Sequence, residues 1–472
     1  MANTLNHRLA RWVVGLKREE IPDEVLTETK LRILDLVGAM LGGSQTALAS
    51  QMRKAVFVPD NGTGTSVIGL PQETGSPSAA LLQGTMGCVL EYDDTHVQAG
   101  IHSSTPVVAA AIAKGQQLQV SGLALIEAVL VGNELSCRLG LAAPGLLHRA
   151  GFHPTGVLGI FGACYAASRL SKLSADQVAN AIGICGSFSS GIMASWEDGS
   201  AAKSLHAGWA ASSGIQAVNL AQNGVSGPAT VYEGRFGFFP SHLRAQQNDL
   251  NYAAIEKNLG EEWEVLNIAP RAFPCGHYIQ PFIDATLTLC AGNRIDVDQI
   301  AEVLCNVAEY MVPLICEPAV EKLRPATSWH ARYSLPFCVS ECLLTGSFTK
   351  YSLAEKDLTD SRYLALMRKV KYQIDQTATD RTRWSGEVRI TFQSGEQIEH
   401  RVENMRGTRQ NPMGSKELRD KFLHNTEGIL SSEEAAAIVE EILCLEKASN
   451  IRTLFAPLSR SKKPREGLSE IV

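Results

Sequence analysis

The stretch from residue 91 to residue 105 has the highest density of side chains that could move protons. It contains three carboxylates, two imidazoles and several hydroxyls, among them Glu91, Asp93, Asp94, Thr95, His96 and His102. Apolar, helix-like segments precede and follow it, and charge that dense between them is hard to explain as core, so we expect an unusual loop. Carboxylates and imidazoles that are held close together shift each other's pKa values, which suits them to acid–base catalysis. We therefore interpret this stretch as the centre of a proton-transfer site.

In each of three further segments, one side chain stands out as a possible acid–base or anion-binding group. His153 lies in the glycine-bracketed sequence G-F-H-P-T-G, Lys203 in D-G-S-A-A-K-S-L-H, and Arg271 at the start of R-A-F-P-C-G-H. Taken singly, a turn histidine, a solvated lysine and a surface arginine are the favoured explanations, although a cation that opens a helix opposes the helix dipole. Taken together with His102, the three segments supply acid–base groups and groups that bind anions.

Motifs that hold cofactors are missing from the sequence. We find no G-x-G-x-x-G, no G-x4-G-K-[ST], no H-E-x-x-H, no G-x-S-x-G and no C-x-x-C. Asp93, Asp94 and His96 could in principle bind a divalent ion, but no further ligands support them, so we predict no metal site. The residues favour proton transfer on an anionic substrate without a cofactor.

Composition limits the classes of partner and the location. The chain has 472 residues, a formal net charge of -6 and 45% hydrophobic residues, so it gives no electrostatic reason to bind nucleic acid or anionic lipid. It has no 18-residue apolar run and no signal peptide, which argues against a membrane span. The 11 cysteines are scattered, as is typical of reduced thiols. We expect a cytoplasmic protein.

The pattern of apolar residues predicts a mainly α protein. Helical periodicity covers residues 24–40, where Asp35 is the lone charge in an apolar run, and also 123–140, 156–171, 175–193 and 203–223. Many of these segments are rich in glycine and alanine, which predicts close helix packing. After residue 270 we expect helices near 278–291 and 333–345, a strand at 301–307 and a hairpin of 387–392 with 397–402. Helices resume at 415. We therefore predict a large helical domain from both chain ends, 1–269 and 404–472, with an inserted α+β lid domain, 270–403.

The four segments together resemble the MmgE/PrpD family. The resemblance rests on the segments E-Y-D-D-T-H with the following H-S, G-F-H-P-T-G, D-G-S-A-A-K-S-L-H-A-G and R-A-F-P-C-G. It extends from about residue 31 to residue 445. That family includes 2-methylcitrate dehydratase, cis-aconitate decarboxylase and iminodisuccinate epimerase. The resemblance implies a helical domain with a smaller α+β lid, a homodimer and a site in the cleft between the domains.

The resemblance also assigns positions. The acidic segment of the family falls on Glu91, Asp93, Asp94 and Thr95, its loop histidine on His102, its G-x-H histidine on His153 and its helix-opening lysine on Lys203. Three positions depart from the family pattern. Arg271 replaces a common lysine, Gln280 replaces a histidine with which His277 is out of step, and Ser103 replaces a frequent proline. These changes lie where substrate carboxylates would be held.

These observations predict a cofactor-independent lyase, a dehydratase or decarboxylase, acting on a small di- or tricarboxylate. We interpret His102 and His153 as acid and base in either order, and Lys203 and Arg271 as carboxylate clamps. Glu91 and Asp94 would orient or tune the histidines. Asp93, Thr95, His277 and Gln280 complete the expected substrate-binding set. Two alternatives stay open, an epimerase or isomerase of an amino- or imino-dicarboxylate and a helical dimer that binds an acidic metabolite without catalysis.

Overall fold

The computed structural model describes residues 3–56, 64–353, 358, 360–380 and 383–460. The chain divides into two compact units. Unit 1 comprises Met1–Val89, Asp93–Ile268 and Gly414–Lys463, and unit 2 comprises Leu90–Tyr92, Ala269–Met413 and Pro464–Val472. Residues 1–2 and 461–472, which belong to the predicted helical domain, lie outside the described residues.

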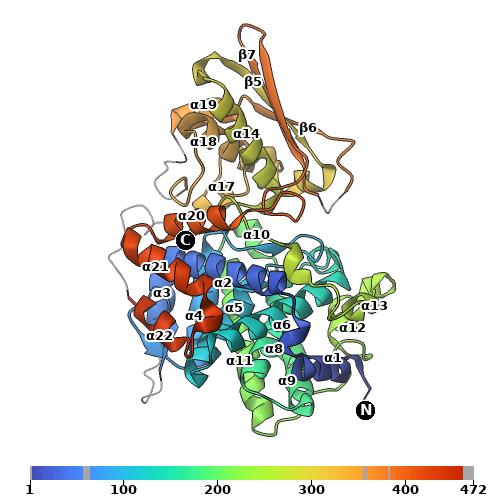
Figure 1. Ribbon diagram of the computed structural model, residues 1–472. Helices are drawn as coiled ribbons and strands as arrows, with labels where there is room; N and C mark the ends of the chain where they lie inside the picture. Colours follow the sequence, from blue (N-terminus) through green and yellow to red (C-terminus); the bar gives the residue numbers. More distant parts are fainter. Residues whose placement is uncertain (1–2, 57–63, 354–357, 359, 381–382, 461–472) are drawn as a thin grey trace. The chain divides into compact units, whose positions relative to one another are not determined.

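Long apolar helices form the centre of unit 1 (Figure 1). They are α2 (Asp23–Gly43), α4 (Ser76–Val89), α5 (Ser104–Leu118), α6 (Gly122–Leu141), α8 (Pro154–Leu170) and α11 (Ala202–Gln222). Helix α11 packs on α4, α8 and α5, and α8 packs on α5 and α6. Their buried faces are largely alanine, valine, leucine and isoleucine, so burial of apolar surface drives this packing.

Glycines let these helices approach one another closely, as their composition predicted. A Cβ atom on Gly84 of α4 would lie 2.7 Å from the Cα atom of Gly208 on α11. A Cβ atom on Gly132 of α6 would lie 2.6 Å from the carbonyl oxygen of Gly162 on α8. Contacts this short exclude any larger side chain, so the backbones of these helix pairs meet directly.

Shorter elements surround the central helices of unit 1. They are α1 (Leu5–Gly15), α3 (Ala47–Val56), α7 (Leu146–Arg149), α9 (Ala175–Phe188), α10 (Ser195–Asp198), α12 (Phe238–His242), α13 (Ala253–Glu256), α20 (Ser415–Thr426), α21 (Ser432–Leu443), α22 (Arg452–Phe455) and the short strands β1 (Thr65–Ser66), β2 (Glu73–Thr74) and β3 (Thr95–His96). The short strand β4 (Ile268–Ala269) spans the point in the chain where unit 1 ends and unit 2 begins. Helix α9 ends five residues before the predicted bound of 193. Gly191 has φ +138°, a conformation that a helix cannot contain.

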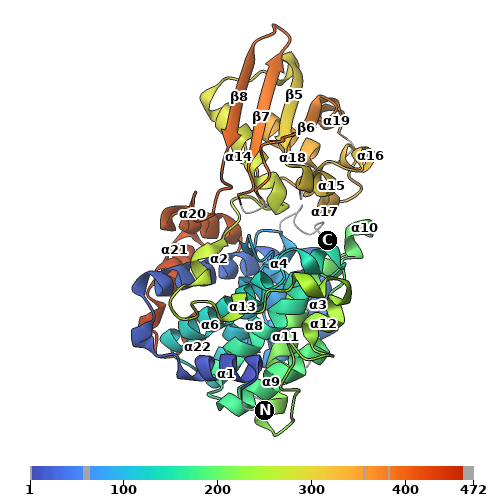
Figure 2. The ribbon, with the colours of Figure 1, turned by 90° about the vertical axis from the view of Figure 1, so that its right-hand side faces the viewer.

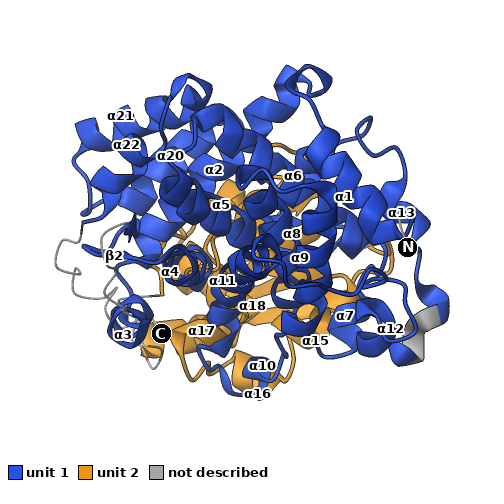
Figure 3. Cartoon of the chain, turned by 90° about the horizontal axis from the view of Figure 1, so that it is seen from below, with its two compact units in different colours: residues 1–89, 93–268, 414–463 blue, residues 90–92, 269–413, 464–472 orange. Residues whose placement is uncertain are grey.

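Two helices from the C-terminal part of unit 1, α20 and α21, pack on α2 from its N-terminal part. Helices α20 and α21 both contact α2, and Figure 3 shows them beside it. Asp35, the lone charge in the apolar run 33–37 of α2, explains part of this contact, because its Oδ1 lies 2.7 Å from Nζ of Lys421 on α20 and both side chains are buried. Asp35 is therefore half of an ion pair that joins residues far apart in the chain.

A four-stranded sheet in the order β6-β5-β7-β8 organises unit 2 (Figure 2). Its strands are β5 (Ile300–Val307), β6 (Val370–Ile374), β7 (Gly386–Phe392) and β8 (Gln397–Val402). The hairpin of β7 and β8 is confirmed, with Val388 opposite His400 and Ile390 opposite Ile398. Strand β6 pairs in parallel with β5 and was not predicted, because its sequence has little apolar alternation.

Helices cover the sheet of unit 2. Helix α14 (Gln280–Gly292) packs on β7 and β8, and α18 (Leu335–Thr345) packs on α14 and β6. The shorter helices are α15 (Val312–Ile315), α16 (Ala319–Lys322), α17 (Ser328–Ala331) and α19 (Ser361–Met367). The mainly α class with strands concentrated in the C-terminal half is confirmed. Among the described helices, none combines the length and the apolar composition needed to cross a membrane.

Candidate functional site

Three histidines from separate segments of unit 1 lie next to one another. We call His102, His153 and His206 the histidine cluster. The ring centroids of His102 and His153 are 5.8 Å apart, and those of His153 and His206 are 5.2 Å apart. His102 precedes α5, His153 is the N-cap residue of α8, and His206 lies in the first turns of α11.

Backbone contacts fix the two histidines that lie in loops. Pro154 occupies the first position of α8, so the helix begins immediately after His153. The backbone N–H of His153 donates to the carbonyl oxygen of Gly191 at 2.9 Å. The backbone N–H of His102 donates to the Thr155 hydroxyl at 3.1 Å, which joins the His102 loop to the start of α8. Thr155 lies within the G-F-H-P-T-G motif, but sequence reasoning did not select it.

The environment of His102 determines which ring nitrogen carries its proton. Nδ1 of His102 lies 2.9 Å from the backbone carbonyl oxygen of Asp94 and 2.5 Å from Oγ1 of Thr95. A carbonyl oxygen can only accept a hydrogen bond, so Nδ1 is the protonated nitrogen. In the neutral ring, Nε2 of His102 therefore bears the lone pair and acts as a proton acceptor.

His153 is held in its neutral form. Burial lowers the pKa of His153 well below its usual value, and the nearby positive charge of Lys203 lowers it further. His102, His206 and His148 act on this pKa in the same direction when they are protonated. The His153 imidazole is therefore uncharged at neutral pH.

Lys203 is a buried cation one helical turn before His206. Its side chain is among the largest fully buried ones, and Nζ lies 3.7 Å from Sγ of Cys88 on α4. Burial first and the charge of Lys203 second lower the pKa of His206 to about 4. A buried ammonium group beside neutral imidazoles can stabilise negative charge as it develops on a substrate.

Asp93 and Asp94 lie buried beneath the His102 loop. Oδ2 of Asp93 accepts a hydrogen bond of 2.9 Å from the Thr105 hydroxyl. Burial raises the pKa of Asp94 to about 7, although the charge of Arg32 and a hydrogen bond from Ser104 act against this rise. Asp94 thus contributes its backbone carbonyl to His102 and a carboxyl group that titrates near neutral pH.

Unit 2 holds the predicted residues Arg271 and Glu91. Nη1 of Arg271 donates to Oε2 of Glu91 at 2.7 Å, to the Glu91 carbonyl oxygen at 2.6 Å and to the Cys275 carbonyl oxygen at 3.1 Å. The Tyr92 hydroxyl donates to the carbonyl oxygen of Ala272 at 3.0 Å, which joins the same two segments. The predicted role of Glu91 in tuning histidines stays a prediction, and its carboxylate is engaged by Arg271.

Gln280 and His277 lie in the segment that follows Arg271. The Gln280 amide accepts from the Phe273 backbone N–H at 3.1 Å and donates to the Phe273 carbonyl at 2.6 Å, so it closes the loop between them. The His277 ring lies 5.3 Å from the Trp384 ring. The structure thus shows Gln280 organising the backbone at the place where the resemblance implies a histidine.

His96, the other imidazole of the dense stretch, is bound elsewhere in unit 1. Its Nε2 lies 2.8 Å from Oε2 of Glu264, and its Nδ1 accepts from the Ala99 backbone N–H at 3.1 Å. Within the described part of the chain, no three His, Cys, Asp or Glu side chains converge as metal ligands would.

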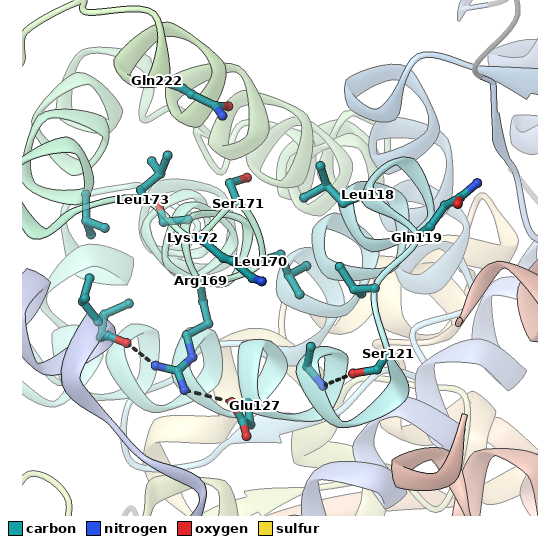
Figure 4. Close-up of a pocket in the computed structure, with 16 residues that line it drawn as sticks. Leu118, Gln119, Ser121, Glu127, Arg169, Leu170, Ser171, Lys172, Leu173 and Gln222 are labelled. Carbon is teal, nitrogen blue, oxygen red and sulfur yellow. Dashed lines mark hydrogen bonds and ion pairs between the residues drawn. The ribbon is translucent and has the colours of Figure 1, made fainter. Parts of the chain in front are cut away.

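A separate cavity in unit 1 is lined by the ends of several helices (Figure 4). It has a volume of about 710 Å³, and none of the predicted site residues lines it. Two cations line it, Arg169 and Lys172. Arg169 pairs with Glu127 at 2.8 Å and donates to the carbonyl oxygens of Val13 and Leu16.

Sequence reasoning missed His206 as a site residue. The signal was its spacing of three from Lys203, which places both side chains on one face of a helix. His102, His153 and Lys203 are brought together in unit 1 with Asp93, Asp94 and Thr95 around them. Arg271, Glu91, His277 and Gln280 belong to unit 2.

The chain is thus a mainly helical protein of two units, with the α+β unit inserted in the sequence of the helical unit and a cluster of acid–base side chains in the helical unit. The MmgE/PrpD N-terminal domain matches residues 7–251, and the MmgE/PrpD C-terminal domain matches residues 273–447. The chain belongs to the MmgE/PrpD family.

Curated relatives match the chain almost from end to end. A cis-aconitate decarboxylase-like protein of Aspergillus oryzae is 28% identical over 468 residues, covering 96% of each chain. The cis-aconitate decarboxylase of Aspergillus terreus is 25% identical over 475 residues, covering 96% of this chain and 95% of the relative. The cis-aconitate decarboxylase of Homo sapiens is 26% identical over 482 residues, covering 98% and 96%.

Proposed function

We propose that the chain is a lyase that acts on an aconitate-like tricarboxylate, with decarboxylation as its reaction and dehydration of a citrate-like acid as the runner-up. The observation that carries the proposal is the end-to-end similarity to proteins named cis-aconitate decarboxylase. The histidine cluster and the buried Lys203 supply the acid–base and charge-stabilising groups that such a reaction uses.

Each residue of the site takes a role that its contacts support. Lys203 stabilises the negative charge that forms on the substrate when the bond to CO2 breaks. The neutral His153 donates or accepts a proton at Nε2, and His102 accepts one at Nε2 because Asp94 holds its other nitrogen as a donor. Thr95 and Asp94 position His102. For Arg271, which Glu91 holds within unit 2, the role of binding a substrate carboxylate rests on the family resemblance.

The reaction needs a proton source and no electron carrier. Loss of CO2 from a carboxylate leaves a carbon that must gain one proton, so each decarboxylation consumes one proton from solution. We propose that imidazoles supply it without a cofactor. Activity should survive exhaustive EDTA treatment, whereas loss on chelation and recovery with one divalent ion would replace this proposal with a metal-dependent one.

One panel of substrates separates the candidate reactions. Purified protein is incubated with aconitate-like, citrate-like and amino-dicarboxylate compounds, and three readouts are followed, which are CO2 release, loss of water and deuterium exchange at the α-carbon in D2O. CO2 release from the aconitate-like acid supports the proposal. Water loss alone supports the dehydratase, and exchange with inversion but no leaving group supports an epimerase. Binding without any conversion supports the non-catalytic alternative.

Two properties of the proposed enzyme concern its state in the cell. We propose a homodimer in the cytoplasm, as the resemblance and the composition predict. Sedimentation equilibrium of the full chain at micromolar concentration measures its mass directly, and a mass of one chain across that range argues against the dimer.

A further inference from the structure

His153 and His206 contact each other through the same kind of ring nitrogen. Nδ1 of His153 lies 3.0 Å from Nδ1 of His206, which is hydrogen-bond distance. Two lone pairs at this distance repel, and so do two N–H groups. The contact is therefore a hydrogen bond only when one nitrogen carries a proton and the other does not.

This requirement links the tautomers of the two rings. When both rings are neutral, each carries one proton. If His206 donates from Nδ1, His153 must carry its proton on Nε2 and can donate there. If His153 donates from Nδ1, its Nε2 bears a lone pair and accepts. The position of one proton between two rings therefore decides whether His153 acts as an acid or as a base.

Close packing holds His206 in this contact. A Cβ atom on Gly156 would lie 3.2 Å from Cβ of His206 and 2.7 Å from the Ser190 carbonyl oxygen. A Cβ atom on Gly191 would lie 3.4 Å from Cγ of His206. Gly191 also accepts the backbone hydrogen bond of His153. The two glycines thus make room for the His206 ring beside the loop that carries His153.

The two rings differ in their access to solvent. His153 is buried, with 2% of its surface exposed, whereas His206 is only partly buried. The Nδ1 contact therefore gives a proton from solvent a path through the partly exposed His206 to the buried His153.

We propose that His153 and His206 form a two-imidazole relay that delivers protons from solvent to the substrate. The inference rests on the proposed lyase function, because decarboxylation consumes one proton per turnover. His206 is the residue that this proposal adds to the reaction, and it acts through His153.

The relay conserves protons and charge. At the start, His206 carries its proton on Nδ1 and His153 carries its proton on Nε2. Nε2–H of His153 goes to the substrate carbon, Nδ1–H of His206 goes to Nδ1 of His153, and a solvent proton goes to Nε2 of His206. Both rings end neutral with exchanged tautomers. After the product leaves, His153 takes a proton at Nε2 from water, its Nδ1 proton returns to Nδ1 of His206, and His206 releases its Nε2 proton to solvent, which restores the starting state.

Charged and titratable groups face the relay from three directions. Lys203 on α11 lowers the pKa of both rings, and His102 before α5 and His148 on α7 lower that of His153. Each of these groups opposes a doubly protonated ring. The relay therefore works through neutral imidazoles, and protonation of either ring in acid should stop it.

The test uses two substitutions that separate hydrogen bonding from proton transfer. His206→Asn keeps an amide near the Nδ1 position but has no second nitrogen to pass a proton on. His206→Ala removes both functions. His424→Asn, at an exposed position on α20, is the matched control. Turnover should fall at least about 100-fold in His206→Asn, the lower end of the range for proton-transfer groups, and further in His206→Ala. Added imidazole should restore part of the activity of His206→Ala.

The number of protons in motion gives a readout that a structural role would not change. Turnover plotted against the fraction of D2O should be curved for the wild type, since two or more protons move together, and straight for His206→Asn. Wild-type turnover with a curved plot in a folded His206→Asn variant would overturn the relay.

A measurement without substrate keeps the relay distinguishable from the proposed function. Nitrogen NMR of 15N-histidine-labelled protein near pH 7 should show one protonated and one unprotonated Nδ1 for His153 and His206. Two protonated or two unprotonated Nδ1 atoms would refute the relay whatever the reaction is. Failure to release CO2 or water with an intact tautomer pair would instead refute the proposed function.

Discussion

The guanidinium group of Arg271 and the carboxylate of Glu91 form a buried ion pair within unit 2. Nη1 and Oε2 are 2.7 Å apart, and each side chain is 1% exposed. Because the same Nη1 also donates to two backbone carbonyl oxygens, the arginine is fixed in position. A fixed cation binds a planar carboxylate with little loss of side-chain entropy, and we propose that Glu91 prepares Arg271 in this way for an anionic ligand.

Replacing Glu91 should therefore destabilise unit 2. Glu91→Gln leaves the Arg271 charge buried without its counter-ion, and breaking a buried pair in this way typically costs about 3–5 kcal/mol. Urea unfolding measures the loss. Asp360→Asn is the matched control, because its partner Arg362 is 76% exposed and such surface pairs contribute about 0–1 kcal/mol. Equal stability of the two variants would show that the buried pair is not structural.

Substitution of either clustered imidazole should remove most of the activity. Positioned acid–base groups contribute about 100- to 10,000-fold in rate, so His102→Ala and His153→Ala should each lower turnover by that much. Steady-state kinetics on folded protein, verified by circular dichroism, make the comparison. A folded His153→Ala variant with near wild-type turnover would assign His153 to structure alone.

The two cations should affect different kinetic constants. Lys203→Met removes the group that we propose stabilises the developing negative charge, so kcat should fall more than KM rises. Arg271→Met removes the proposed carboxylate clamp, so KM should rise more than kcat falls. Initial rates over a range of substrate concentrations separate the two. The reverse pattern, with Lys203→Met changing only KM, would exchange the proposed roles.

The local sequence pattern predicted most helices and the hairpin, but it could not predict contacts between residues that lie far apart in the chain. The periodicity of residues 203–223 and the hairpin at 387–402 contain their own signals. Strand β6 does not, because its place in the sheet depends on β5, which lies more than 60 residues earlier. Asp35 was visible as an isolated charge, but its partner Lys421 lies at the other end of the chain.

In the candidate site, too, some residues had a local sequence signal and others are defined only by contacts that the fold creates. His102, His153 and Lys203 were identified from motifs that recur in a family. The Nδ1 contact that gives His206 its proposed role arises from the crossing of α8 and α11, and no spacing within either helix encodes it. Likewise, Glu91 was grouped with the histidines because it is adjacent in sequence, whereas the fold turns its carboxylate to Arg271.

Several groups of unit 1 have shifted pKa values, including Glu134, His148 and His206, and among them Asp94 and His153 should make opposing contributions to the pH dependence of stability. Asp94 has a pKa raised to about 7, against about 3.9 in the unfolded chain. Between these values only the folded state holds the proton, so this contribution is present in acid and is lost as pH rises towards 7. His153 has a pKa lowered well below about 6.5, its unfolded value, so its contribution is present above that pH and is lost as pH falls.

Single substitutions should separate these contributions. Each proton changes the unfolding free energy by up to about 1.4 kcal/mol per pH unit, and the contributions of Asp94 and His153 change in opposite directions as pH falls below about 6.5. Relative to the wild type, Asp94→Asn should therefore lose stability as pH falls below about 6.5, whereas His153→Asn should gain stability. Urea unfolding at half-unit pH steps measures both slopes, with His424→Asn as the control. Parallel pH profiles for Asp94→Asn and His153→Asn would mean that neither group is held in the protonation state that its burial predicts.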